Sequence, residues 1–154
     1  MQTIPDKYIK LLSTWFYIGY FPLAPGSMAS VAGALMAMIF SSQPFLYILA
    51  TAVVTVLGFK VSGRMEEMGT QKDPSCIVID EVAGVLIAFA WLPLSWPVII
   101  TAFFLFRAFD MFKLYPVNKF DSIPGAKGIM MDDIVAGIYT NITMQLAVRW
   151  AGLI

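Results

Sequence analysis

The segment Lys72-Asp-Pro-Ser-Cys-Ile-Val-Ile-Asp-Glu-Val-Ala-Gly84 decides how the rest of this chain is interpreted. It contains two adjacent acids, Asp80 and Glu81, directly before an uncharged stretch that runs from Val82 to Phe106. A carboxylate beside hydrocarbon carries a high free-energy cost unless a bound group compensates its charge. The segment therefore predicts that this acid pair binds a ligand.

A second segment, Gly128-Ile-Met-Met-Asp-Asp-Ile-Val-Ala-Gly137, repeats the same design. If both segments open helices, each glycine lies four residues after an acid and on the same helix face. Glycines that face each other allow two helices to approach closely, as small residues do in membranes. The two acid pairs would then converge.

Four converging carboxylates cannot all be ionised without a cation between them. Because the ligands are oxygens only, the expected ion is a hard cation, Mg²⁺ first and Mn²⁺ next. The predicted metal ligands are Asp80, Glu81, Asp132 and Asp133. The alternative interpretation makes Asp80 and Asp132 helix N-caps, and makes Glu81 and Asp133 first-turn acids favoured by the helix dipole.

Composition predicts a single domain, residues 1–154, that lies in or on a membrane. The chain has 59% hydrophobic and 13% charged residues, whereas an average soluble domain has about 25% charged residues. The net charge is zero and no basic run is present, which argues against nucleic acid as a partner. Histidine is absent and cysteine occurs once, which excludes the usual zinc sites and Ser-His-Asp triads.

The apolar runs predict an all-α fold, a compact membrane helical bundle of short hairpin-connected helices. Met28–Phe40 and Phe45–Phe59 are each shorter than the ~20 residues of a straight span, which predicts two short helices joined by a tight turn. Pro93 and Pro97 interrupt the stretch 82–106, so it forms either a second hairpin or one kinked span. Residues 5–20 predict an N-terminal interfacial amphipathic helix, with a packed surface helix as the alternative.

Two hairpins would place the N-terminus, residues 60–81 and residues 107–131 on one side of the membrane. That side would hold every basic residue except Arg149, together with all ten acids. The positive-inside tendency makes it the cytoplasmic side. A single crossing by residues 82–106 would instead separate the two acid pairs.

A phosphate site is predicted beside the acids. Arg107, Asp110 and Lys113 are three residues apart and share one side of a helix end, and two cations flanking an acid suit a phosphate next to a metal. A surface ion-pair group is the alternative. Gly26 and Ser27 follow a proline and offer N–H groups and a hydroxyl to phosphate oxygens, with a plain N-cap at Ser27 as the alternative.

Four blocks of sequence together resemble the phosphatidylglycerophosphatase A family. They are Ala24–Ser27, Lys72–Gly84, Phe106–Asp110 with Lys113 and Pro116, and Gly128–Gly137. The resemblance implies an all-helical enzyme of the bacterial cytoplasmic (inner) membrane that uses Mg²⁺ to hydrolyse phosphatidylglycerophosphate to phosphatidylglycerol and inorganic phosphate. It implies catalytic or binding roles for the acids and cations Asp73, Asp80, Glu81, Asp110, Asp132, Asp133, Arg107 and Lys113.

Three alternatives to this function are considered. A divalent-cation carrier also uses acid pairs on membrane helices, but here every acid flanks an apolar run. A membrane alcohol phosphotransferase would need an Asp-Gly-x-x-Ala-Arg signature, which this chain lacks. A phosphatase of the same family acting on another phosphorylated lipid stays open, as do the number of metal ions, the nucleophile and the oligomeric state.

Overall fold

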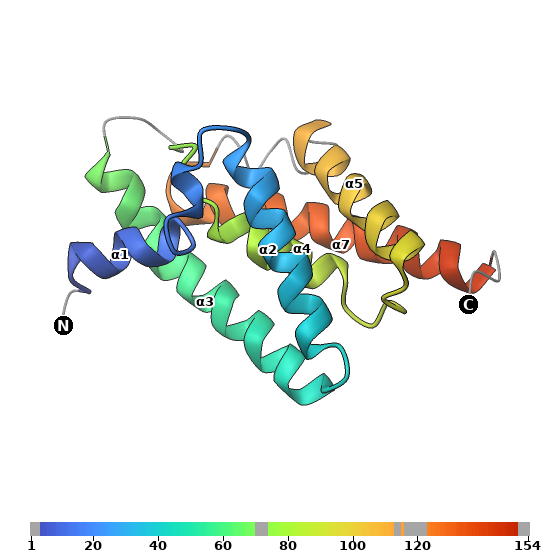
Figure 1. Ribbon diagram of the computed structural model, residues 1–154. Coiled ribbons are helices and arrows are strands. Elements are labelled where there is room, and N and C mark those ends of the chain that lie inside the picture. Colours follow the sequence, from blue (N-terminus) through green and yellow to red (C-terminus); the bar gives the residue numbers. More distant parts are fainter. Residues whose placement is uncertain (1–3, 70–73, 113–114, 116–122, 151–154) are drawn as a thin grey trace.

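The computed structural model describes residues 4–69, 74–112, 115 and 123–150, and within these residues the chain forms helices and connections but no strand. The all-α prediction is therefore confirmed (Figure 1). The elements are α1 (Asp6–Ser13), the short 3₁₀ helix η1 (Ile18–Tyr20), α2 (Pro25–Phe40), α3 (Pro44–Met68), α4 (Ile79–Ala88), α5 (Trp96–Phe112) and α7 (Ala126–Trp150).

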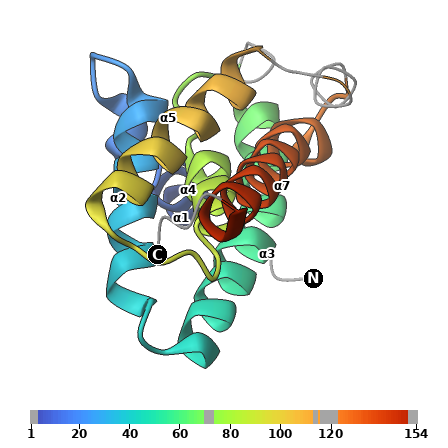
Figure 2. The ribbon, with the colours of Figure 1, turned by 90° about the vertical axis from the view of Figure 1, so that its right-hand side faces the viewer.

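The short helix α4 forms the centre of the bundle. All of its residues except Glu81 and Ile87 are buried, and it packs against α2, α3, α5 and α7. Figure 2 shows α4 enclosed between α2 and α7. The apolar sequence after Asp80 is thus the core of the bundle, and this places the first acid pair where the surrounding helices meet.

The two predicted glycines hold α4 and α7 together. A side chain at Gly137 would collide with the backbone oxygen of Gly84, and a Cβ at Gly84 would lie 2.8 Å from the backbone oxygen of Asp133. The prediction that these glycines face each other is confirmed. Such close backbone approach is typical of helix pairs with small residues at the contact.

The end of α4 is capped by amide side chains of α7. Asn141 Nδ2 donates hydrogen bonds to the carbonyl oxygens of Ala88 (3.0 Å) and Ala90 (2.8 Å), and Gln145 Nε2 donates to Ala90 (3.1 Å). The last carbonyls of a helix have no partner inside the helix and need one where water is excluded. These amides therefore let α4 end inside the bundle, which the sequence analysis did not foresee.

The predicted end of the third helix is wrong. It was placed at Phe59, but α3 continues through the polar interval to Met68. Lys, Arg, Glu and Met are good helix formers, and Val61 and Met65 are buried on the inner face while Arg64 and Glu67 are exposed. Among the described residues, α3 is the one helix long and apolar enough to cross a membrane, and only 28% of its most apolar stretch is buried.

The N-terminal segment is divided rather than one continuous helix. α1 ends at Ser13, and Trp15, Phe16 and Tyr17 adopt positive φ angles of 44°, 55° and 70° before η1. Ile9 is 2% exposed and α1 packs against α3, so one face of α1 is buried in the bundle. The interfacial location of this segment stays a prediction.

Candidate active site

Three of the four predicted metal ligands meet in one cluster. Asp80 and Glu81 lie in the first turn of α4, and Asp133 lies in α7. One carboxylate oxygen from each of the three residues lies within 4.8 Å of the other two. The close approach of α4 and α7 at Gly84 and Gly137 therefore brings the acid pairs together, as the sequence predicted.

The cluster is costly in its ionised form. Asp133 is 3% exposed, and its burial raises the pKa of its carboxyl well above the usual range, with Asp110, Asp80 and Glu81 adding to the rise. Burial raises the pKa of Glu81 to about 7, reinforced by Asp110 and opposed by Arg107 and by hydrogen bonding with Asp80. A cation between the carboxylates would remove this cost.

The donor set fits a hard cation. The three residues offer oxygen atoms only, which suits Mg²⁺ or Mn²⁺ better than softer metals. Glu81 Oε2 is buried and has no hydrogen-bond partner within the described residues. A buried carboxylate oxygen of this kind is explained by an ion that the acids would share.

Asp132 lies outside this three-acid cluster. It is buried at 7% exposure, and its Oδ1 accepts a hydrogen bond from the backbone N–H of Asp133 at 3.0 Å. The cluster that the structure brings together is thus smaller than the predicted set of four.

The alternative interpretation is wrong about the N-caps, because neither Asp80 nor Asp132 caps a helix, but Glu81 does lie in a first helical turn as it expected. Val78 holds the N-cap position of α4, and Asp80 follows inside the first turn. α7 begins at Ala126, well before the apolar run that starts at Ile134, so Asp132 and Asp133 lie in the helix interior. Glu66 accepts the backbone N–H of Gly125 at 2.7 Å and thereby stabilises this earlier start.

The Arg107–Asp110 pair belongs to the cluster rather than to the surface. Arg107 Nη1 donates to Asp110 Oδ2 at 2.7 Å, and the two side chains are only 17% and 16% exposed. Both groups act electrostatically on Glu81. This position confirms the predicted hairpin of α4 and α5, because α5 returns Arg107 to the start of α4. Arg107 Nε is buried without a hydrogen-bond partner among the described residues.

Gly26 allows the first turn of α2 to lie against Glu81 and Arg107. A Cβ at this residue would collide with Glu81 Oε1 and lie 3.5 Å from Arg107 Nη1. The predicted N-cap at Ser27 is wrong, because α2 begins at Pro25 and Ser27 is a half-buried residue of its first turn. The sequence predicted an N–H donor at Gly26, whereas its small size also matters here, and a Pro-Gly pair opening an apolar helix is a signal for that.

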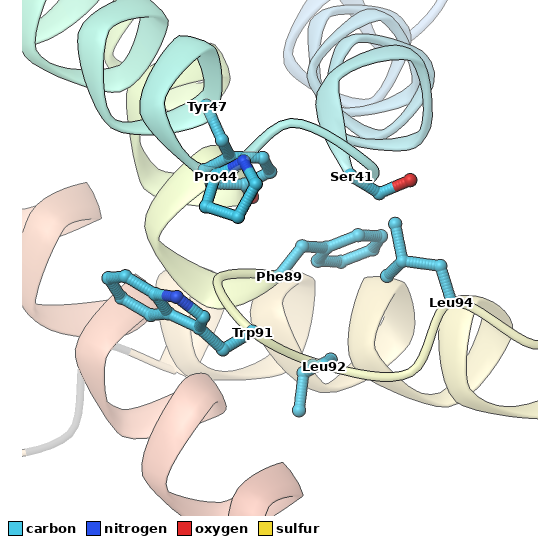
Figure 3. A pocket seen from close by; sticks show the side chains of 7 residues that line it. All are labelled: Ser41, Pro44, Tyr47, Phe89, Trp91, Leu92 and Leu94. Atoms are coloured by element: carbon cyan, nitrogen blue, oxygen red, sulfur yellow. The ribbon is translucent and has the colours of Figure 1, made fainter.

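Two predicted site residues, Asp73 and Lys113, lie outside the described residues. At the far end of α4, Figure 3 shows a different, small cavity of about 50 Å³ lined by Ser41, Pro44, Tyr47, Phe89, Trp91, Leu92 and Leu94. Its lining has no acid or base, so the candidate active site is the acidic cluster and not this cavity.

These features describe an all-helical protein in which buried carboxylates and an arginine form a site suited to a cation and a phosphate. Residues 11–148 match the model of the phosphatidylglycerophosphatase A family. The chain therefore belongs to that family and is a phospholipid phosphatase, which confirms the predicted family and enzyme class. Family membership also argues against the cation carrier.

Three relatives cover most of the chain. A Bacteroides thetaiotaomicron protein named "Putative phosphatidylinositol-3-phosphatase" is 37% identical over 95% of this chain and 96% of its own length. Haemophilus influenzae phosphatidylglycerophosphatase A is 37% identical over 92% and 90%. Escherichia coli phosphatidylglycerophosphatase A is 35% identical over 83% and 76%. No solved structure matches the chain. The bacterial relatives and the apolar α3 indicate a membrane protein.

Proposed function

We propose that this protein hydrolyses phosphatidylglycerophosphate to phosphatidylglycerol and inorganic phosphate in a Mg²⁺-dependent reaction. The observation that carries the proposal is the buried cluster of Asp80, Glu81 and Asp133 beside Arg107 and Gly26. The family and the names of the Haemophilus and Escherichia relatives support this substrate.

The acids of α4 and α7 would hold the metal. Asp80, Glu81 and Asp133 supply three carboxylates with oxygens within 4.8 Å of one another, and Asp132, which accepts the N–H of Asp133, is the proposed fourth acid that fixes their arrangement. When bound, Mg²⁺ supplies charge neutralisation for the phosphoryl oxygens and lowers the pKa of water. The chain's own contribution is to hold the carboxylates so close that only a cation makes them stable together.

Arg107 is the proposed phosphate-binding group. Its guanidinium can donate two parallel hydrogen bonds to phosphate oxygens, and its ion pair with Asp110 fixes its orientation. Gly26 and Ser27 lie in the first turn of α2, where free backbone N–H groups attract anions. Lys113 stays proposed as a second cation from the family resemblance.

Carboxylates must carry the proton transfers, because the chain has no histidine. Asp80, Asp110, Asp133 and Asp73 are the proposed catalytic acids. Asp110 and Asp133 interact electrostatically with each other, so a proton removed from attacking water has an acceptor beside the phosphate.

The proposed location is the bacterial inner membrane, with the cluster at its cytoplasmic edge. Apart from Arg149, the basic residues lie on the same side of the predicted topology as the acids. An excess of basic residues is typical of the cytoplasmic side. The hydrocarbon part of the substrate would stay at the depth of the membrane while the phosphate reaches Arg107.

The direct test is phosphate release by the purified protein from phosphatidylglycerophosphate, with Mg²⁺ and with EDTA, beside phosphatidic acid and phosphatidylinositol 3-phosphate. We expect release from phosphatidylglycerophosphate to be fastest and to stop in EDTA. Equal release in EDTA would overturn the metal dependence. Faster release from phosphatidylinositol 3-phosphate would favour the second candidate function, which the name of the Bacteroides relative supports.

A further inference from the structure

An apolar groove of about 210 Å³ runs between α2 and α5. Val31, Leu35 and Met38 line it from α2, and Ile100 and Phe103 line it from α5. Figure 2 shows these two helices side by side at one edge of the bundle. The groove has a floor of Ala34 and Ile99, each 7% exposed, and its walls are outward-facing side chains such as Leu35 and Ile100, which are 55% and 53% exposed.

The groove leads to the proposed phosphate site. On α5, residues 96, 100, 103 and 107 share one helix face, so the groove residues Trp96, Ile100 and Phe103 are followed along that face by Arg107. On α2, Ser27 precedes Val31 by four residues and shares its face. Each wall of the groove therefore ends at a residue of the phosphate site.

The distance from the far end of the groove to the phosphate site matches one leaflet of a bilayer. Trp96 and Arg107 are eleven positions apart, as are Ser27 and Met38, so at 1.5 Å per residue the path along each helix from the far end of the groove to the phosphate site is about 16 Å. The hydrocarbon core of a bilayer is about 30 Å thick, so one leaflet contributes roughly 15 Å.

We propose that this groove receives an acyl chain of the phospholipid substrate and thereby presents its phosphate to Arg107 and the acidic cluster. The inference rests on the proposed function and adds the binding site of the lipid's hydrocarbon part. The distance to the phosphate site, the apolar lining and the continuity with Arg107 define one occupant. It is a single acyl chain of a phospholipid whose phosphate lies at the start of α2.

A second apolar groove provides an internal comparison. It has a volume of about 340 Å³ and is lined by Ile48, Ala52 and Ile142 together with Ile87 and Trp91 at the end of α4. That end lies opposite to Asp80 along α4. A lipid chain in this groove would fill space without presenting a phosphate to the acids.

The groove contributes orientation more than affinity. An acyl chain that leaves the bilayer for the groove exchanges one hydrocarbon environment for another, so little hydrophobic free energy is gained. A positioned phosphate nevertheless reacts faster than one that samples many orientations. Blocking the groove should therefore impair turnover of long-chain lipid and spare a substrate without acyl chains.

The test compares Ala34→Phe, which fills the floor, with Ala52→Phe, the same substitution in the second groove. Each protein is assayed in bilayers with long-chain phosphatidylglycerophosphate and, separately, with its water-soluble deacylated headgroup. We expect Ala34→Phe to lower kcat/KM for the lipid by about tenfold and to leave hydrolysis of the headgroup unchanged. Ala52→Phe should behave as wild type with both substrates.

Leu35→Trp provides a second variant, because its exposed side chain narrows the groove without changing the buried floor. Equal lipid hydrolysis in Leu35→Trp, Ala34→Phe and wild type would overturn the groove while leaving the proposed function intact. Absence of hydrolysis in wild type itself would instead reject the proposed function.

A photoactivatable acyl-chain analogue of the substrate gives a readout that does not depend on catalysis. We expect it to label α2 and α5 in wild-type protein, and excess phosphatidylglycerophosphate should remove that label but not the label on α3. Labelling that excess substrate does not displace would mean ordinary bilayer lipid only and would overturn the inference. A change of oligomeric mass in Ala34→Phe would assign the groove to a second copy of the chain and overturn it too.

Discussion

The two acid pairs look alike in sequence but occupy different positions in the fold. Asp80 and Glu81 lie in the first turn of α4, and both reach the cluster. Asp132 and Asp133 lie inside α7, and only Asp133 joins them. Two adjacent acids therefore contribute two carboxylates to the cluster from α4 and one from α7.

The difference follows from where each helix begins. In the first turn of α4, free backbone N–H groups and the positive end of the helix dipole stabilise two adjacent acids. Asp132 and Asp133 lie beyond the first turn of α7, where the effect of the helix dipole has fallen off. Asp132 accepts the N–H of Asp133 instead of reaching the cluster. A repeated motif thus predicts a shared site better than it predicts equal roles.

The largest expected effect separates the two members of the second pair. Asp133→Asn should lower the rate of phosphate release by about 10³-fold, because it removes a carboxylate on which charge stabilisation depends. Asp132→Asn should lower it by only about tenfold, since it disturbs the arrangement and leaves the three-acid cluster present. Steady-state kinetics of the two variants and of Asp80→Asn at saturating Mg²⁺ measure the difference. Equal losses in both would restore the predicted four-ligand site.

The next prediction concerns the helix contact that holds the two acid pairs close to each other. Gly137→Ala would place a methyl group against the backbone of Gly84 and push α7 away from α4. We expect activity to fall by about 10²-fold, because displacement of catalytic groups by an ångström is sufficient for such a loss. Gly58→Ala is the matched control, since its added methyl meets the flexible end of the Met130 side chain rather than backbone. An active Gly137→Ala variant would show that the cluster does not depend on this contact.

Much of this fold could be predicted from the sequence, because its strongest signals are local. The apolar runs, the two acid pairs and the glycines four residues later predict the α4–α7 contact. The prolines 93 and 97 are compatible with a hairpin or a kinked span, and the hairpin is the one that keeps both acid pairs on one side. The extension of α3 and the early start of α7 could not be predicted, since polar residues such as Arg64 and Lys127 are compatible with helix or loop. Tertiary contacts decide such cases.

The site was predicted less completely for a similar reason. The role of Gly26 depends on how closely α2 approaches Glu81, which no local pattern encodes. The amides Asn141 and Gln145 bond the carbonyls that follow α4, a role that depends on where α4 ends against α7. A pair of amides four residues apart in an apolar helix is a signal that could have suggested this role.

A smaller effect is expected at the arginine that lies beside the first pair. Arg107 lowers the pKa of Glu81, and its guanidinium is the proposed phosphate ligand. Arg107→Ala should raise KM by about tenfold with a smaller change in kcat, because a hydrogen bond to a charged group contributes about 1.5–3 kcal/mol. Arg107→Lys should rescue little, since lysine lacks the planar fork. Arg64→Ala, at an exposed ion pair with Glu67, is the control. An unchanged KM would remove Arg107 from phosphate binding.

The smallest expected effect concerns the stability of the metal-free protein. Burial raises the pKa of Glu81 from its ordinary value of 4.5 to about 7, so the folded state binds a proton more tightly than the unfolded state does. Stability then falls as pH rises wherever the folded state holds more protons. The loss begins near pH 4.5, is complete above about pH 7, and after allowance for partial solvent access amounts to about 1–2 kcal/mol.

Glu81→Gln should therefore be more stable than wild type in EDTA at pH 8 and no more stable at pH 4.5, as measured by urea unfolding at both values. Glu67→Gln, at an exposed position, is the control. It should not change the difference in the free energy of unfolding between the two pH values. Saturating Mg²⁺ should reverse the order at pH 8, because an ion held by Glu81 stabilises the folded state by mass action. If wild type stays less stable than Glu81→Gln with Mg²⁺ present, Glu81 is not a metal ligand. Each acid pair would then contribute one ligand.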